Sequence, residues 1–213
     1  MAVLHPYIAI EGVIGAGKTS LATMLAKTYN AKLLLENFDD NPFLERFYKE
    51  PDKYAFALEM SFMAERFQQL KDHLIAPDLF HERVVADYIT EKSVVFASKT
   101  LPDDIFILYK KMFNIVFSNI PKPDLLVYLY ASPERLLHNI AVRGRDFEKN
   151  IAADYLKDLQ EGYIEYIKNI KDTRTLIIDI NNIDFVNNPD DYNRLCDAIF
   201  KEYPIGVNIE NFV

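Results

Sequence analysis

A run of glycines followed by Lys18 and Thr19 is the part of this sequence best suited to chemistry. Residues 8–20 read IAIEGVIGAGKTS, in which glycine, lysine and threonine follow the spacing G-x-x-x-x-G-K-T. Glycines let backbone N–H groups turn inward around an anion, the lysine adds a positive charge, and the threonine hydroxyl can reach Mg²⁺. A simple turn does not explain why Lys and Thr follow the last glycine. The pattern predicts a phosphate-binding loop whose contacts with a nucleotide come from Gly12, Gly15, Ala16, Gly17, Lys18, Thr19 and Ser20.

A strand before this loop and a helix after it would hold the loop in place. The sequence predicts a strand at about 7–11 and a helix that follows the loop and ends near Tyr29. The positive end of that helix dipole would point at the bound phosphate.

The rest of the chain alternates between apolar runs and amphipathic stretches. Strands are predicted at 31–36, 83–88, 124–132 and 175–180. Helices are predicted before Pro51 and at 54–76, 90–98, 103–118, 133–143, 152–168 and 190–202, and the tail from Pro204 is expected to be irregular. Near-continuous apolar strands alternating with helices are typical of a parallel sheet covered on both faces. The sequence therefore predicts an α/β fold, with a five-stranded parallel sheet and helices on both faces, in one domain over 1–213.

Polar residues follow several of these predicted strands. Glu36, Asp87 and Ser132 lie at or just past strand ends, as does Gly12 in the phosphate loop. Ligands of open α/β sheets bind outside the carboxyl ends of the strands, so these residues are expected to converge on one cleft.

The basic segment RGR follows the predicted helix at 133–143. Arg143 and Arg145 are separated by one glycine, so both side chains could reach a transferring phosphoryl group. Small kinases keep a lid at this place in the chain, and a lid is predicted at about 143–150. The alternative is a pair of solvated loop charges, which would not need a phosphate loop elsewhere in the chain.

Composition narrows the possible classes of protein. The net charge is −8, which argues against a general nucleic-acid binder. The single cysteine, Cys196, can form no internal disulfide and fits a reducing compartment. No apolar stretch reaches the ~20 residues of a membrane span, and the first residues do not resemble a signal peptide. We expect a cytoplasmic protein without a membrane partner.

The motifs of other phosphate-loop proteins are missing. The guanine-binding motif N-K-x-D is absent, and so is a D-x-x-G after the third predicted strand. A long helical insertion lies between the second and third strands, where a kinase would hold its second substrate. These features favour a small-molecule kinase over a switch GTPase or a motor-like ATPase.

The sequence resembles the deoxynucleoside kinase family over nearly its whole length. The loop IEGVIGAGKTS, the segment ENFDDNPFL followed by FYKEP and the long helix, and RGRDFEKNIAADYL carry the resemblance, which is strongest to the bacterial purine-kinase branch. The resemblance implies a P-loop kinase fold with a lid segment, ATP and Mg²⁺ as cofactors, a small nucleoside as the acceptor, and a homodimer. The helix at 103–118 is apolar around much of its circumference, which suits burial against a partner.

The family's catalytic pattern assigns roles to several residues. Glu36 matches the general base that accepts the proton of the 5′-hydroxyl of the sugar. Arg143 and Arg145 would stabilise the charge on the transferring phosphoryl group, and Lys18 would bind the β and γ phosphates. Thr19 would contact Mg²⁺, and Asp87 would lie near Mg²⁺ or the reacting hydroxyl.

The same resemblance assigns contacts to the sugar and to the adenine of ATP. Tyr48 and Glu148 match the residues that hold the sugar 3′-hydroxyl. Asp184 and Phe185 resemble the segment that packs on the adenine, although the match is short.

The nucleobase-binding position departs from the family pattern. The long helix has Glu59 where the family has a glutamine. Glu59 is either a surface residue or a reader of the base. An ionised carboxylate only accepts hydrogen bonds, which favours the two adjacent donors of guanine, whereas adenine would require a protonated carboxyl. The sequence therefore predicts a purine deoxynucleoside kinase that prefers deoxyguanosine slightly over deoxyadenosine.

Two cationic positions of the family also differ. An arginine that often follows the acid after the third strand is missing, because Asp87 is followed by Tyr88 and Ile89. Arg66 or Lys92 could supply its contact, or the contact is lost. Asn139 lies where some relatives have another lid cation.

Two other functions remain open from the sequence. A nucleoside monophosphate kinase, such as a thymidylate kinase, would need extra cations near its acceptor, but residues 36–48 contain one arginine among four acids. A non-catalytic nucleotide-binding module would keep the phosphate loop without needing Glu36 or the lid arginines.

Overall fold

The computed structural model describes residues 4–36, 41–75, 80–145, 148 and 151–212. The chain divides into two compact units, each built from separate stretches of sequence. The first unit comprises Met1–Leu35, Leu79–Ile89 and Lys122–Val213, and the second comprises Glu36–Asp78 and Thr90–Pro121. The expectation of a single kinase domain over 1–213 stays a prediction.

The first unit contains a parallel sheet in which the described residues form six strands. Their order is β2-β3-β1-β4-β5-β6, and every neighbouring pair is parallel. The strands are β1 (Tyr7–Gly12), β2 (Lys32–Leu34), β3 (Val84–Ala86), β4 (Leu125–Tyr130), β5 (Arg174–Asp179) and β6 (Gly206–Asn211). The α/β fold and the parallel sheet predicted from the sequence are thereby confirmed.

The prediction of five strands is wrong, because the tail contains β6. This strand pairs with β5 in a register that runs from Arg174 opposite Gly206 to Asp179 opposite Asn211. β6 lies at the edge of the sheet, and the side chains of Val207 and Ile209 are exposed. An edge strand of this kind lacks the continuous apolar run by which the buried strands were recognised.

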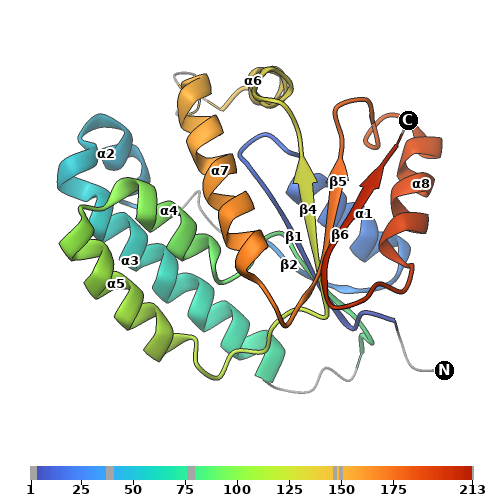
Figure 1. The fold of residues 1–213 in the computed structure, drawn as a ribbon, viewed down its shortest axis with the longest axis horizontal. Helices are drawn as coiled ribbons and strands as arrows, with labels where there is room; N and C mark the ends of the chain where they lie inside the picture. The colour runs from blue at the N-terminus through green and yellow to red at the C-terminus, as the bar shows by residue number, and fades with distance from the viewer. Residues whose placement is uncertain (1–3, 37–40, 76–79, 146–147, 149–150, 213) are drawn as a thin grey trace. The chain divides into compact units, whose positions relative to one another are not determined.

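Helices of the first unit cover both faces of the sheet. They are α1 (Lys18–Thr28), α6 (Pro133–Arg143), α7 (Ala153–Asn169) and α8 (Pro189–Ile199). α1 and α8 lie on one face and α7 lies on the other, while α6 follows the carboxyl end of β4 (Figure 1). The core is made of apolar side chains such as Ile8 and Ile10 of β1 and Leu125 of β4, all fully buried.

Local signals explain where α6 begins and ends. Ser132 accepts a hydrogen bond from the backbone N–H of Arg135 at 3.3 Å, and Pro133 occupies the first turn, where no N–H is required. The helix ends at Gly144, whose φ of 72° is left-handed. α6 is thus fixed at both ends, and Arg143 lies in its last turn.

The described part of the second unit is helical. It contains α2 (Leu44–Lys49), α3 (Pro51–Leu70), the π-helical turn η1 (Lys71–Ile75), α4 (Lys92–Thr100) and α5 (Asp103–Val116). α3 begins three residues before the predicted start, because Pro51 is compatible with a first helical turn. Pro77, expected to end this helix, lies outside the described residues.

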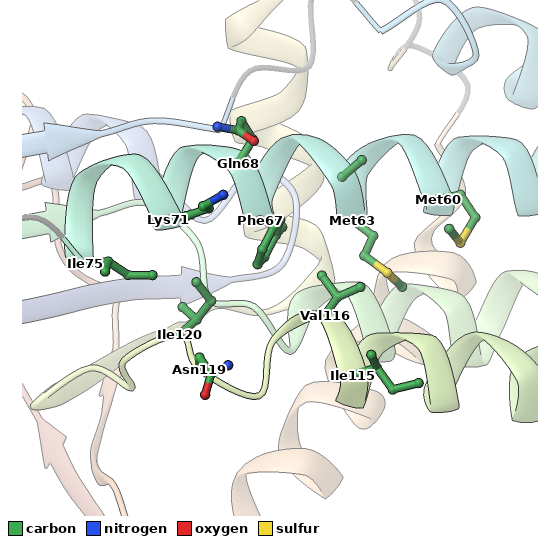
Figure 2. A pocket seen from close by; sticks show the side chains of 11 residues that line it. Met60, Met63, Phe67, Gln68, Lys71, Ile75, Ile115, Val116, Asn119 and Ile120 are labelled. Carbon is green, nitrogen blue, oxygen red and sulfur yellow. The ribbon is translucent and has the colours of Figure 1, made fainter.

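An apolar groove lies between α3 and α5 in the second unit. It has a volume of about 600 Å³ and is lined by residues that include Met60, Met63, Phe67, Ile115 and Val116. Figure 2 shows Met63 and Phe67 of α3 directed toward the end of α5. Met63 and Phe67, which lie four residues apart on α3, therefore face α5.

Among the described residues, no helix has the length and apolar character required to cross a bilayer.

Candidate active site

The phosphate loop connects the end of β1 to the start of α1, as the sequence predicts. Gly15 and Gly17 have φ values of 89° and 84°, in the left-handed region that favours glycine. A Cβ on Gly15 would lie 2.6 Å from the carbonyl oxygen of Leu136, and one on Gly17 would lie 2.9 Å from the ring of Phe185. Both positions therefore require glycine for their backbone conformation and for their close packing.

Lys18 is the first residue of α1, and its side chain lies over its own loop. Its ammonium donates to the carbonyl oxygen of Gly12 at 2.8 Å and to that of Val13 at 3.2 Å. The positive charge is thereby held beside the backbone that the glycines shape. A lysine in this position, together with the N-terminus of α1, favours binding of a phosphate.

Thr19 and Asp87 are brought together, although 68 residues separate them in the chain. The Thr19 hydroxyl donates to the Asp87 carboxylate at 2.5 Å, and Asp87 is buried just after β3. Within the described ranges, no group of three or more His, Cys, Asp or Glu side chains could hold a metal ion. Mg²⁺ in kinases uses one or two carboxylates together with substrate phosphates, so this hydroxyl–carboxylate pair fits it.

Glu11 is a site residue that sequence reasoning missed. It is fully buried in β1, and its two carboxylate oxygens accept from the backbone N–H groups of Gly12 and Ile89, each at 3.1 Å. The carboxylate thus joins the start of the phosphate loop to the segment that carries Asp87. The only signal in the sequence is an acid inside an otherwise apolar strand.

The described lid residues form one ion-pair cluster. Arg143 donates to Glu148 through Nη2 at 2.5 Å and Nε at 3.1 Å, and Arg145 approaches Glu148 at 3.5 Å. Glu148 is buried, whereas about a third of each arginine side chain is exposed. The remaining lid positions 146–147 and 149–150 lie outside the described residues. The contact of Glu148 with a sugar hydroxyl stays a prediction.

Asp184 and Phe185 are adjacent in the sequence but differ in exposure. Asp184 is exposed and accepts hydrogen bonds from the backbone and side chain of Asn187. Phe185 is buried, with its ring against Gly17. Phe185 therefore packs against the phosphate loop at Gly17. Its contact with adenine stays a prediction.

Glu36 lies in the second unit, where it forms two buried ion pairs. Its Oε1 accepts from Arg66 Nη2 at 2.5 Å and Nε at 2.8 Å, and its Oε2 pairs with the Lys92 ammonium. Burial alone would raise the pKa of Glu36, but the charges and hydrogen bonds of Arg66 and Lys92 together lower this pKa to about 2. Both substitutes considered for the missing arginine therefore contact the predicted base, which is ionised at neutral pH.

Glu59 lies on α3, seven residues before Arg66, and is 3% exposed. The alternative of a surface residue is therefore excluded. Thr100 Oγ1 donates to Glu59 Oε1 at 3.1 Å, and the Tyr109 hydroxyl donates to the Glu59 backbone carbonyl at 3.2 Å. Burial raises the pKa of Glu59 to about 7, against the opposing effects of the Arg66 charge and the Thr100 hydrogen bond.

Arg66 pairs with Glu36, and its charge lowers the pKa of Glu59. Its guanidinium also donates to the buried Ser93 hydroxyl at 2.5 Å. Ser93, Thr100 and Tyr109 were not expected from the sequence. Their partners lie on α3, whereas they lie on α4 and α5, so no spacing within one helix indicates them.

Tyr48 lies on α2 and is half-buried. Its ring makes an edge contact with Phe47, with a centroid separation of 5.6 Å. The predicted hydrogen bond from Tyr48 to a sugar hydroxyl stays a prediction. Likewise, the convergence of the phosphate loop and Glu36 on one cleft stays a prediction.

A parallel sheet with a glycine-rich phosphate loop after its first strand and helices on both faces is the P-loop kinase fold. The sequence model of the deoxynucleoside kinase family matches residues 8–203. The chain belongs to the deoxynucleoside kinase family and is an enzyme, a phosphotransferase with an alcohol group as acceptor.

Individual relatives agree with this assignment. The chain is 40% identical to a deoxyguanosine kinase of Bacillus subtilis (strain 168) over 197 residues, covering 89% of this chain and 94% of the relative. It is 35% identical to a deoxyadenosine kinase of Dictyostelium discoideum over 199 residues, covering 92% and 79%. The solved structure of a deoxyadenosine kinase from M. mycoides with bound dATP has a TM-score of 0.79 at 24% identity, covering 92% of this chain and 100% of that chain, which supports the fold.

Proposed function

We propose that this enzyme transfers the γ-phosphoryl group of ATP to the 5′-hydroxyl of a purine deoxynucleoside, with Mg²⁺, and produces the 5′-monophosphate for nucleotide salvage. The observation that carries the choice of a purine is the buried acid Glu59 on α3, whose carboxylate accepts a hydrogen bond from Thr100. Relatives named deoxyguanosine kinase and deoxyadenosine kinase support it.

In this proposal, residues of the first unit bind the phosphates of ATP. Lys18 and the N-terminus of α1 hold the β and γ phosphates, and Arg143 and Arg145 stabilise the charge that develops on the transferring group. Because both arginines contact Glu148, they must leave or share that carboxylate when the phosphate binds. Mg²⁺, held by Thr19 and Asp87, would neutralise charge on the phosphate oxygens.

Glu36 is the proposed acceptor for the 5′-hydroxyl proton. With its pKa near 2, Glu36 is a weak base while both cations contact it. Phosphoryl transfer needs positioning more than strong basicity, so a fixed carboxylate that orients the hydroxyl is sufficient for this step. A hydroxyl that replaced Lys92 at Oε2 would also raise the basicity of Glu36.

Glu59 is the proposed reader of the base. In its ionised form, Glu59 can accept both adjacent donors of guanine, whereas its protonated form has one donor and one acceptor, as adenine requires. A pKa near 7 leaves both forms populated at neutral pH. The enzyme is therefore proposed to accept both purines, with deoxyguanosine slightly preferred.

The proposal also includes a cytoplasmic homodimer. Ile107, Leu108 and Ile115 of α5 are exposed apolar side chains in the isolated chain, which suits burial against a second copy.

Replacing Glu59 by glutamine is expected to shift the preference for deoxyguanosine toward deoxyadenosine, by about tenfold to a hundredfold in the ratio of kcat/KM values. The amide has a fixed donor and acceptor, so it mismatches one guanine donor and matches adenine. The measurement is phosphorylation of deoxyguanosine, deoxyadenosine, deoxycytidine, thymidine and dTMP by wild type and variant. Glu65→Gln, an exposed position on the same helix, is the matched control.

Each other outcome of this assay has a definite meaning. An unchanged ratio in Glu59→Gln would remove Glu59 as the reader of the base. Phosphorylation of dTMP alone would identify a nucleoside monophosphate kinase. ATP binding without phosphorylation of any acceptor would identify a non-catalytic nucleotide-binding module.

The base preference is also expected to depend on pH. As pH falls through about 7, Glu59 gains a proton and becomes a donor, so the kcat/KM for deoxyadenosine should rise relative to that for deoxyguanosine. The measurement is this ratio between about pH 6 and about pH 8, where a pKa near 7 has its largest effect. Glu59→Gln should remove the dependence, and a ratio independent of pH in wild type would contradict the role of Glu59.

The raised pKa of Glu59 also makes the stability of the fold depend on pH. Because folding raises the pKa of Glu59 from 4.5 to about 7, its contribution to stability is fully present below about 4.5 and is lost as pH rises through about 7.

A further inference from the structure

A side chain of α6 donates a hydrogen bond to the phosphate loop, and the proposed chemistry gives this side chain no role. The Asn139 side-chain amide donates to the carbonyl oxygen of Gly15 at 2.8 Å. α6 also packs closely against this glycine, because a Cβ on Gly15 would be 2.6 Å from the backbone carbonyl oxygen of Leu136 and 3.0 Å from the side chain of Ile140. The loop therefore packs against the backbone and an apolar side chain of α6, and it accepts a side-chain hydrogen bond from Asn139.

The peptide between Gly15 and Ala16 is held at both of its polar ends. Its carbonyl accepts from Asn139, and its N–H, on Ala16, donates to the Val13 carbonyl at 3.0 Å. This peptide group cannot rotate without breaking one of these hydrogen bonds. Since Gly15 and Gly17 on either side have left-handed φ, its fixed orientation sets the direction of the neighbouring N–H groups.

Asn139 also relates the loop to the lid. Arg143 lies four residues later on α6, and residues four apart lie on the same face of a helix. An amide is uncharged, so Asn139 can position the loop without competing with Lys18 or the arginines for phosphate.

We infer that Asn139 is a positioning residue, which fixes the shape of the phosphate loop and its place relative to Arg143. This inference rests on the proposed function of the loop in binding ATP.

Asn139→Leu removes the donor and keeps a side chain of similar shape. It is expected to raise the Kd for ADP and the KM for ATP about tenfold, the usual effect of losing one hydrogen bond, and to leave the nucleoside KM within about twofold. Asn139→Ser, which is too short to reach Gly15 and adds no apolar group, should give the same change and serves if the leucine variant does not fold.

A matched control exists on α7. Asn169 donates through the same atom to the Glu165 carbonyl, also at 2.8 Å, on the exposed end of that helix. Asn169→Leu should leave the ADP affinity and both KM values unchanged. A loss of ADP affinity in this control equal to that in Asn139→Leu would overturn the inference.

Failure of the inference is distinguishable from failure of the proposed function. If wild type phosphorylates nucleosides and both Asn139 variants bind ADP with wild-type affinity, Asn139 has no positioning role and the proposed function stands. If wild type neither binds ADP nor phosphorylates a nucleoside, the proposed function fails and the inference fails with it.

Discussion

Replacing Glu36 by glutamine is expected to lower kcat by about two to three orders of magnitude, because the variant loses the acceptor for the 5′-hydroxyl proton. Glu36 is also the carboxylate between the buried cations Arg66 and Lys92. Removing one partner of buried ion pairs typically costs about 3 kcal/mol or more. The free energy of unfolding, measured by urea titration, should therefore fall as well.

Catalysis and folding can be separated with two further variants. Glu36→Asp keeps the negative charge for Arg66 and Lys92 but withdraws the carboxylate, so it should lose activity while retaining most of the stability. Glu50→Gln is the matched control, since Glu50 pairs with Lys53 at 3.2 Å on an exposed surface. This control should change neither quantity, because exposed ion pairs contribute little.

The assignment of Glu36 fails under a clear condition. If folded Glu36→Gln, shown by unchanged ADP affinity, phosphorylates deoxynucleosides at the wild-type rate, Glu36 is not the base. Its two ion pairs would then be purely structural.

Replacing Lys18 by methionine is expected to lower kcat by about two to three orders of magnitude and to raise the KM for ATP. The charge of Lys18 is the part of the loop that would interact with phosphates undergoing transfer. The structure gives this ammonium hydrogen bonds to the Gly12 and Val13 carbonyls, which Met cannot replace. The measurement is steady-state phosphorylation with ATP and Mg²⁺ at varied ATP concentration.

Lys27 on the same helix provides the control for Lys18. It is exposed in the last turn of α1, so Lys27→Met removes an equal charge without touching the loop. Wild-type kinetics in Lys27→Met together with a large loss in Lys18→Met would support the phosphate role. Wild-type kinetics in both would show that the loop does not use Lys18.

Much of the fold could be predicted from local sequence signals. The phosphate loop, the buried strands and the start of α6 each have a signature in residue type and spacing, and the structure has them at the predicted places. The predicted start of α3 was three residues late, because a proline in the first turn is compatible with a helix. β6 was missed because an exposed edge strand does not need an apolar run.

The sequence by itself determined the family and the identity of most proposed site residues, since glycine, lysine and arginine motifs depend on nearest neighbours in the chain. Only the tertiary structure decided the protonation state of the carboxyl groups and the hydrogen-bond and ion-pair partners of the side chains. It buries Glu59, gives Glu36 both Arg66 and Lys92, and directs Asn139 to Gly15. Burial and hydrogen-bond partners depend on which helices pack together, and residues distant in sequence supply them, so the charge of a carboxyl group cannot be predicted from its own stretch of chain.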